Sequence, residues 1–232
     1  MTNAVNIEEN AKKVIDAVAR AAERAGRAPE EITLVAASKT NNAEAVRRAL
    51  GAGITVFGEN RVQEMVEKNA EGAYEGAELH FIGHLQKNKV NKVVGLCSLI
   101  QSVDSKELLA AIDYRARSLG IIQDLLLEIN IGGEASKSGL APEQLDQMLE
   151  EASKFDSIRV RGLMTIPPFE ALGGEADTFF FQMHKLFIDN SVKKYDNVYM
   201  DFLSMGMSGD FERAIEFGAN MVRVGSAIFG AR

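Results

Sequence analysis

Hydrophobic and polar residues follow one another along the chain in two rhythms, one typical of helices and one typical of buried strands. The chain opens with apolar residues at helical spacing (Ile7, Ala11, Val14, Val18 and Ala21), which predict an amphipathic helix. Short apolar runs then recur between longer stretches of helical spacing. These runs predict eight strands, over residues Ile32–Ala37, Thr55–Gly58, Leu79–Ile82, Leu99–Val103, Leu125–Ile131, Arg159–Thr165, Val198–Ser204 and Met221–Gly225.

Helical patterns fill the intervals between the predicted strands. They cover Asn42–Leu50, Arg61–Ala70, Gln86–Val94, Ser105–Leu119, Pro142–Ser153, Glu175–Val192 and Gly209–Phe217. Residues that commonly begin or end helices stand at their boundaries. Ser105 is placed to cap a helix and Pro142 to begin one. Gly51, Gly120 and Gly218 each follow a helical pattern, where a left-handed residue is expected to end the helix.

The alternation of strands and helices indicates a parallel sheet. Several strand-like runs are almost continuously apolar, as expected when helices cover both faces of the sheet. Eight such units in 232 residues predict an α/β fold, a closed (β/α)8 TIM barrel, with an additional N-terminal helix. An open doubly wound sheet is the alternative. No linker rich in Pro, Ser or Gly divides the chain, so we expect one barrel domain over residues 1–232.

Composition adds the expectation of a cytoplasmic globular protein. Hydrophobic residues make up 46% and charged residues 25% of the chain, and no apolar run reaches the roughly 18 residues of a membrane helix. The first six residues lack the basic start and apolar core of a secretory signal. Cys97 is the single cysteine, so an internal disulfide is impossible, and its apolar neighbours predict a buried thiol in a reducing compartment.

The net charge of −7 argues against a nucleic-acid-binding protein. One local exception is the basic group formed by Lys87, Lys89 and Lys92, which is either a solvated helix face or an anion patch. The histidines predict no metal site. His80 and His84 fall within or just after a strand and so do not share a helix face, while His184 lies on a helix.

In a barrel of this kind the active face lies at the carboxyl ends of the strands. Lys39 follows the first predicted strand directly. A lysine at the end of a buried strand can be desolvated, which lowers the pKa of its amine and allows it to form Schiff bases with carbonyl ligands. An ordinary solvated lysine is the alternative.

Two loops near the C-terminus have the composition of a phosphate site. Ser204–Gly209 and the segment that begins with Gly225 and Ser226 follow the seventh and eighth predicted strands, where such barrels frequently bind phosphate. Two ordinary turns would have the same composition. A Schiff-base lysine beside a phosphate site would suit a ligand with an aldehyde and a phosphate, which describes pyridoxal 5′-phosphate (PLP). The chain contains neither a dinucleotide-binding glycine motif nor a P-loop.

Several segments resemble signatures of the pyridoxal 5′-phosphate homeostasis proteins. They are Val35–Thr40, Phe57–Glu64, His80–Lys89, Ser136–Gly139, Arg161–Met164, Leu203–Ser208 and Met221–Gly230. The resemblance extends from about Ile32 to the C-terminus. It implies a single-domain barrel of the alanine-racemase type, with PLP held as an internal aldimine by Lys39.

The resemblance also implies roles for individual residues. The PLP phosphate would rest on Ser204 and on main-chain amides around Gly225 and Ser226. Arg223 would face the pyridine nitrogen, where an always protonated group favours an unprotonated ring and a weak electron sink. A buried structural ion pair is the alternative for Arg223.

Two further positions are implied at the same site. Asn60 would hydrogen-bond near the cofactor, or else cap a turn. Met164 would pack at the barrel mouth, as core packing alone would also explain.

The first functional hypothesis is a non-catalytic protein that buffers or delivers PLP, with transient contact with PLP-dependent apoenzymes as one route of delivery, and that acts as a monomer. The second is an amino-acid racemase or related PLP enzyme. Racemases take an opposing tyrosine from a second domain, whereas this chain stops at Arg232 after its eighth unit and its tyrosines lie outside the motif loops, at positions 74, 114, 195 and 199. A lysine-dependent aldolase and an interaction module without a ligand remain further alternatives.

Overall fold

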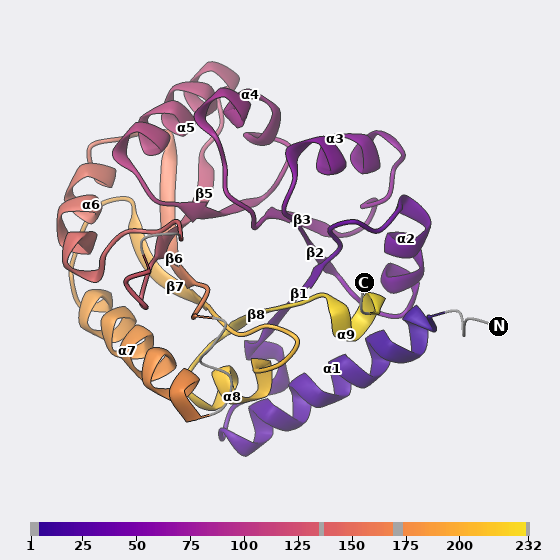
Figure 1. The fold of residues 1–232 in the computed structure, drawn as a ribbon. Coiled ribbons are helices and arrows are strands. Elements are labelled where there is room, and N and C mark those ends of the chain that lie inside the picture. Colours follow the sequence, from indigo (N-terminus) through magenta and orange to yellow (C-terminus); the bar gives the residue numbers. More distant parts are fainter. Residues whose placement is uncertain (1–4, 135–136, 169–173, 231–232) are drawn as a thin grey trace. The chain divides into compact units, whose positions relative to one another are not determined.

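Strand β1 (Thr33–Ala37) pairs in parallel with β2 (Val56–Glu59) on one side and with β8 (Met221–Val224) on the other. Because the first strand pairs with the last, the sheet closes, and the strands follow one another from β1 to β8 around a barrel (Figure 1). This confirms the predicted closed barrel and excludes the open doubly wound sheet. The structure, a computed structural model, describes residues 5–134, 137–168 and 174–230.

The contacts divide the chain into two compact units. The first comprises Met1–His80 and Gly206–Arg232, and the second comprises Phe81–Met205. Besides β1, β2 and β8, the first unit contains helices α1 (Ile7–Arg24), α2 (Ala43–Gly51), α3 (Val62–Ala70), α8 (Phe211–Glu216) and α9 (Ser226–Phe229). Strand β3 (Glu78–Phe81) spans the boundary between the units.

The second unit contains strands β4 (Leu99–Val103), β5 (Gln123–Ile129), β6 (Ile158–Thr165) and β7 (Val198–Ser204), together with helices α4 (Val90–Val93), α5 (Lys106–Leu119), α6 (Leu145–Ala152) and α7 (Gly174–Ser191). The four strands pair in parallel in this order. Leu125, Leu126 and Leu127 of β5 are all fully buried. Successive residues of a strand point to opposite faces, so this sheet is covered on both sides, as its apolar run predicts.

Helix α1 is the predicted addition to the barrel. Its five periodic apolar residues are all buried, and the helix packs along α8 and α9 within the first unit (Figure 1). Side-chain contacts anchor it at several points: Asn10 Nδ2 donates to the carbonyl of Ile228, and Arg24 pairs with Glu212 and Glu216. The hydrophobic stripe therefore predicts both the helix and the face that it buries.

The helix ends agree with the predictions in most places. Gly120 and Gly218 have the expected positive φ, at 66° and 95°. Gly51 does not, because α2 continues through it and Gly53 (φ 104°) takes the left-handed conformation. Ile54 N–H then bonds to the carbonyl of Ala49, which is the backbone pattern of a helix stop at Gly53.

The sequence signals were less accurate at two helix starts and in one whole segment. Ser105 occupies the N-cap position of α5, although its side chain makes no capping hydrogen bond, and Pro142 begins a 3-10 turn that leads into α6. Residues 86–94, predicted as one helix, form a 3-10 turn at Lys87–Lys89 followed by the short α4. Within the described residues, no helix is long and apolar enough to span a bilayer.

Candidate functional site

Lys39 lies in a tight turn immediately after β1. Ser38 before it is fully buried, Lys39 itself is half-buried, and Thr40 after it is exposed. Asn41 N–H donates to the carbonyl of Ser38 at 3.1 Å and closes the turn. The carbonyl of Lys39 accepts hydrogen bonds from Thr40 Oγ1 at 2.6 Å and Asn41 Nδ2 at 3.0 Å. The lysine therefore projects from a backbone segment that local hydrogen bonds hold in place.

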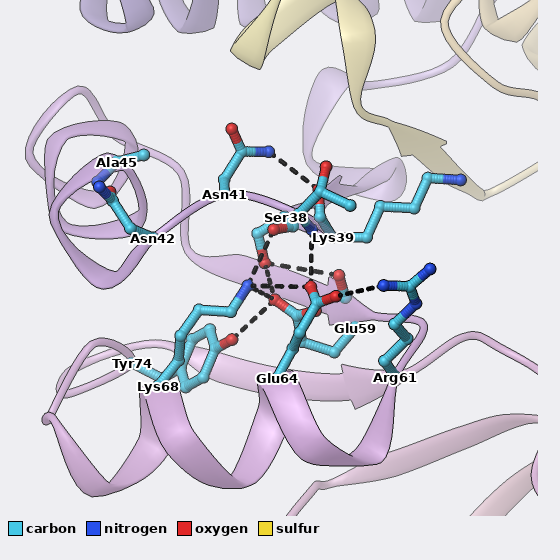
Figure 2. A network of polar contacts seen from close by, with 12 residues as sticks. Ser38, Lys39, Asn41, Asn42, Ala45, Glu59, Arg61, Glu64, Lys68 and Tyr74 are labelled. Atoms are coloured by element: carbon cyan, nitrogen blue, oxygen red, sulfur yellow. Dashed lines mark hydrogen bonds and ion pairs between the residues drawn. The ribbon is translucent and has the colours of Figure 1, made fainter. Parts of the chain in front are cut away.

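A buried polar cluster lies beneath this turn, between β2 and α3 (Figure 2). Its centre is Glu59, a fully buried residue whose Oε1 accepts from Ser38 Oγ at 2.5 Å, Lys68 Nζ at 2.5 Å and Tyr74 Oη at 2.8 Å. Burial, and secondly the carboxylate of Glu59, raise the pKa of Tyr74 above its ordinary value, so its hydroxyl stays neutral and donates. The cluster thus combines one close ion pair with neutral donors.

The end of β8 lies beside the end of β1 within the first unit. The register pairs Val35 with Arg223 and Ala36 with Val224. A Cβ atom placed on Gly225 would lie 3.1 Å from the carbonyl oxygen of Ala37. The segments that contain Lys39 and Gly225 are therefore neighbours at the carboxyl ends of two paired strands.

The loop before α8 contacts the segment after β8 through Ser208. Its Oγ accepts hydrogen bonds from the N–H groups of Gly225 at 3.1 Å and Ala227 at 3.3 Å. A serine hydroxyl has two acceptor positions and one proton to donate. Because both acceptor positions are used, the Ser208 proton is directed to a different acceptor. Sequence analysis singled out this loop without assigning Ser208, although a serine in a phosphate-type loop is itself a signal.

Asn60 stands directly after β2, and it has a buried amide oxygen. Among the described residues, Asn60 Oδ1 has no hydrogen-bond partner. A buried polar atom without a partner lowers stability unless a ligand or water satisfies it. This orphaned oxygen fits the expectation that a polar small molecule completes the site. Arg223, also implied in the site, is 4% exposed and belongs to β8.

The second unit brings together the two remaining predicted residues. Met164 of β6 and Ser204 of β7 are register partners, and both are fully buried. Ser204 Oγ donates to Gln101 Oε1 at 2.7 Å, a contact with a buried amide of β4 that sequence analysis missed. In the segment 136–139, Ser136 lies outside the described residues, while Ser138 Oγ lies 3.1 Å from His84 Nδ1.

The other candidate groups named from the sequence differ in their burial. Lys87, Lys89 and Lys92 are exposed, as a solvated face requires. Cys97 is buried as predicted, and burial raises the pKa of its thiol to about 12. His80 is buried in β3, His84 is exposed and His184 is half-buried on α7. Among residues 5–134, 137–168 and 174–230, no group of three or more His, Cys, Asp or Glu side chains could hold a metal ion.

The closed barrel and the lysine turn after β1 define a class of protein. Residues 10–232 match the family described as alanine racemase, N-terminal domain, and the chain belongs to that family. Within it, the chain belongs to the pyridoxal phosphate homeostasis proteins. The protein of that name from Aquifex aeolicus is 42% identical over 228 residues, which cover 98% of this chain and 99% of the relative.

Solved structures show the same architecture. A protein from Bifidobacterium adolescentis, described only as unknown, has a TM-score of 0.87 and 36% identity, with 96% of this chain and 94% of that chain covered. PipY of Synechococcus elongatus, solved with PLP bound, has a TM-score of 0.81 and 34% identity, with 92% of this chain and 100% of that chain covered. The family resemblance read from the sequence motifs is therefore confirmed.

Proposed function

We propose that this protein binds PLP through a Schiff base with Lys39 and takes part in intracellular PLP homeostasis by buffering or delivering the cofactor. One observation carries the proposal: β1 pairs with β8, which sets the lysine turn beside the segment of Gly225. The bound PLP of PipY and the names of the relatives support the choice of ligand. PLP supplies an aldehyde that reacts with amines and a pyridine ring that withdraws electrons.

Lys39 supplies the attachment. Its neutral amine adds to the aldehyde carbon, a carbon–nitrogen double bond forms, and the aldehyde oxygen leaves as water. The local hydrogen bonds of the turn keep the backbone of Lys39 in one conformation, so the amine is presented from a fixed point.

The phosphate is held by the loops that follow β7 and β8. Ser208 donates the hydroxyl proton that its two amide contacts leave available, and the segment of Gly225 and Ser226 adds backbone donors. Since the amide of Gly225 already donates to Ser208, this amide orients the hydroxyl and Ser208 makes the contact with the anion. Ser204 and Met164 complete the proposed set of binding residues, and the buried oxygen of Asn60 accepts from the ligand or a bound water.

Arg223 faces the pyridine ring in the proposed complex. A guanidinium group is always protonated and can only donate hydrogen bonds, so it keeps the ring nitrogen unprotonated. The ring then withdraws electrons more weakly than a ring with a protonated nitrogen.

The positions of the tyrosines support a non-catalytic role. Tyr74 is buried in the polar cluster, where it donates to Glu59, and its raised pKa opposes a role as a base. Tyr114 on α5 is 77% exposed, and Tyr199 on β7 is 46% exposed. A racemase needs acid and base groups on both faces of the substrate carbon. A buried tyrosine that donates to a carboxylate and a tyrosine exposed to solvent are both unsuited to be the second of these groups.

The test is titration of the purified protein with PLP, followed by borohydride reduction and peptide mass spectrometry. We expect visible absorbance of a Schiff base and a reduced pyridoxyl adduct on Lys39. Lys39→Ala should abolish both signals and leave the thermal unfolding midpoint unchanged. Lys87→Ala is the matched control, because Lys87 is an exposed lysine outside the proposed set of binding residues; it should behave as the unaltered protein.

Two results would overturn the proposal. One is the lack of PLP absorbance at saturating ligand, and the other is an adduct spread over exposed lysines with Lys39 unmodified. Incubation with amino acids separates carriage from catalysis, since turnover at about 1 s⁻¹ or faster would identify an enzyme.

We propose in addition that the chain forms one domain, acts as a monomer in the cytoplasm and passes PLP to apoenzymes through transient contacts. The single buried cysteine and the negative net charge suit a reducing compartment and a protein that avoids nucleic acid. A single cooperative unfolding transition and a monomeric mass in light scattering are the expected results. Separate transitions for the two contact units would contradict the single domain.

A further inference from the structure

We propose that Glu59, Lys68 and Glu64 are positioning residues that hold the turn of Lys39 in the conformation needed to capture an aldehyde. The inference rests on the proposed binding of PLP at Lys39 and assigns its geometry to side chains that do not touch the ligand. The three residues lie on β2 and α3, in the layer between strand and helix (Figure 2).

The turn needs support because Thr40 has an unfavourable backbone conformation. Its φ is +64°, and it is the one residue other than glycine with a positive φ in the described part of the chain. A β-branched side chain is rare in this region, where the Cβ atom crowds the backbone. Such a conformation persists only when surrounding contacts enforce it. Thr40 follows Lys39 directly, so the φ angle of Thr40 sets the direction of the backbone after the lysine.

Ser38, on the other side of Lys39, is held by all three of its polar groups. Its N–H donates to the carbonyl of Gly58 at 3.0 Å and its hydroxyl to Glu59 Oε1 at 2.5 Å. Its carbonyl accepts from Lys68 Nζ at 2.9 Å. Lys68 is only 5% exposed, so its amine makes these contacts away from bulk water. The residue before Lys39 is therefore fixed by a buried charged side chain.

Thr40 is held by the second carboxylate. Its N–H donates to Glu64 Oε2 at 2.6 Å, and the same oxygen lies 3.9 Å from Lys68 Nζ. Lys68 thus lies between the two carboxylates. Glu59 binds Ser38 before Lys39, and Glu64 binds Thr40 after it. Hydrogen bonds to charged groups are stronger than neutral ones, which suits a contact that opposes backbone strain.

The composition of the cluster argues for a role in positioning. A buried ion pair adds little net stability, because desolvation of the two charges offsets their attraction. Hydrophobic residues would fill the same layer without any polar atoms to satisfy. The charged groups instead make directional contacts with the backbone of Ser38 and Thr40, which apolar side chains cannot do. Such directional contacts restrict the conformation of the backbone that they join.

The test compares rates of Schiff-base formation in stopped-flow absorbance with PLP. Lys68→Met alone would leave Glu59 as a buried unpaired charge and could unfold the protein. The main variant is therefore Glu59→Gln/Lys68→Met, which removes both charges together. We expect its rate constant to fall by between about tenfold and about a hundredfold, because the misplaced amine meets the aldehyde less often in a reactive geometry.

Two further variants separate positioning from general destabilisation. Asp113→Asn is the matched control: Asp113 is 4% exposed, and it accepts from Ser157 N–H at 2.8 Å in the second unit. It should lower the unfolding midpoint and leave the rate unchanged. Thr40→Gly, added to the double variant, should restore most of the lost rate, because glycine adopts positive φ without strain.

The outcomes separate the two proposals. If the unaltered protein forms no Schiff base with PLP, both the proposed function and this inference fail. If it forms the Schiff base and Glu59→Gln/Lys68→Met reacts at the same rate, only the inference is overturned. An equal loss of rate in Asp113→Asn would also overturn it, since the effect would then reflect stability alone.

Discussion

Gly225 lies against the carbonyl oxygen of Ala37, at a distance that leaves little room for a side chain. A Cβ atom on Gly225 would stand 3.1 Å from that oxygen and 3.4 Å from the Cβ of Ala37. These two residues lie at the ends of the paired strands β8 and β1. Because glycine has no Cβ atom, the segment after β8 can approach the lysine turn this closely.

Substitution of Gly225 should therefore weaken PLP binding. In Gly225→Ala the added methyl must displace one of the two strand ends by a few tenths of an ångström, and we expect an increase of about threefold to tenfold in the Kd for PLP. Gly225→Val should weaken binding further. Gly51→Ala is the control, because nothing lies within 4 Å of a Cβ atom on Gly51. An unchanged Kd in Gly225→Val would contradict the proposed geometry.

Replacement of Arg223 should change the spectrum of bound PLP. Arg223→Ala removes the buried guanidinium, and we expect weaker binding and a shifted visible absorbance, since the ring nitrogen loses its donor. Absorbance titration measures both effects. Arg20→Ala, a change at an exposed position of α1, should alter neither. A spectrum identical to that of the unaltered protein would exclude contact between Arg223 and the ring.

Gly162 should be intolerant of any side chain. Its φ is +142°, and a Cβ atom there would lie 1.9 Å from the carbonyl oxygen of Phe202, where the register between β6 and β7 shifts. Gly162→Ala should lower the free energy of unfolding by about 4 kcal/mol or prevent folding, as severe backbone clashes do. Urea unfolding monitored by circular dichroism provides the measurement. A loss below about 1 kcal/mol, similar to that of common surface substitutions, would show that the bulge relaxes.

The ion pair between Glu8 and Arg48 should make stability depend on pH. Two hydrogen bonds, at 2.8 and 2.7 Å, join these side chains of α1 and α2, and the guanidinium lowers the pKa of Glu8 from 4.5 to about 2. A carboxyl group whose pKa is lower in the folded state stabilises the fold above its unfolded pKa. This contribution is full above pH 4.5 and is lost as pH falls from there to about 2.

Thermal unfolding of the unaltered protein and Arg48→Met tests this dependence. The difference between their midpoints should be constant from pH 5 to pH 7 and shrink toward about pH 2, and added salt should reduce it at neutral pH. If the difference between the two midpoints grows on acidification, the prediction is wrong. Lys13→Met provides a comparison, because Lys13 pairs with Glu9 within α1 and does not join two helices.

Cys97 should resist thiol reagents in the folded protein. Burial raises the pKa of its thiol to about 12, so the reactive thiolate form is scarce at pH 8. Urea exposes the residue and returns the pKa to its ordinary range, after which one thiol per chain should react rapidly. Ellman's reagent measures both rates. Fast reaction without denaturant would show that the segment around Cys97 opens readily.

Much of the fold could be predicted from local patterns. The period of apolar residues places α1 and every strand within a few residues of their observed bounds. Errors arise where neighbouring residues compete for one role. Gly51 and Gly53 are both suited to end α2, and only the exact length of the helix selects Gly53. Residues 86–94 contain β-branched valines at 90, 93 and 94, which limit helix length in a way the apolar spacing does not reveal.

The candidate site was only partly predictable. Lys39 and the loops near Gly225 could be singled out because their residue types suit an amine and an anion site at strand ends. Lys68 could not be assigned, because its partner Glu59 lies in another element and a charged residue on a helix usually faces solvent. One signal was present: Lys68 follows Met65 by three residues, on the buried face of α3.

Three features could be read from the amino-acid sequence alone: the order of strands and helices, the chemistry available at each strand end and the family to which the chain belongs. Periodicity and residue type report local backbone conformation and burial, and these depend on residues close together in the chain. The folded chain was needed to show that β1 pairs with β8, that Ser208 accepts from Gly225 and Ala227, and that Glu59 meets Lys68. Those contacts join residues of different strands, helices and loops, so the pattern of residues along one element does not report them.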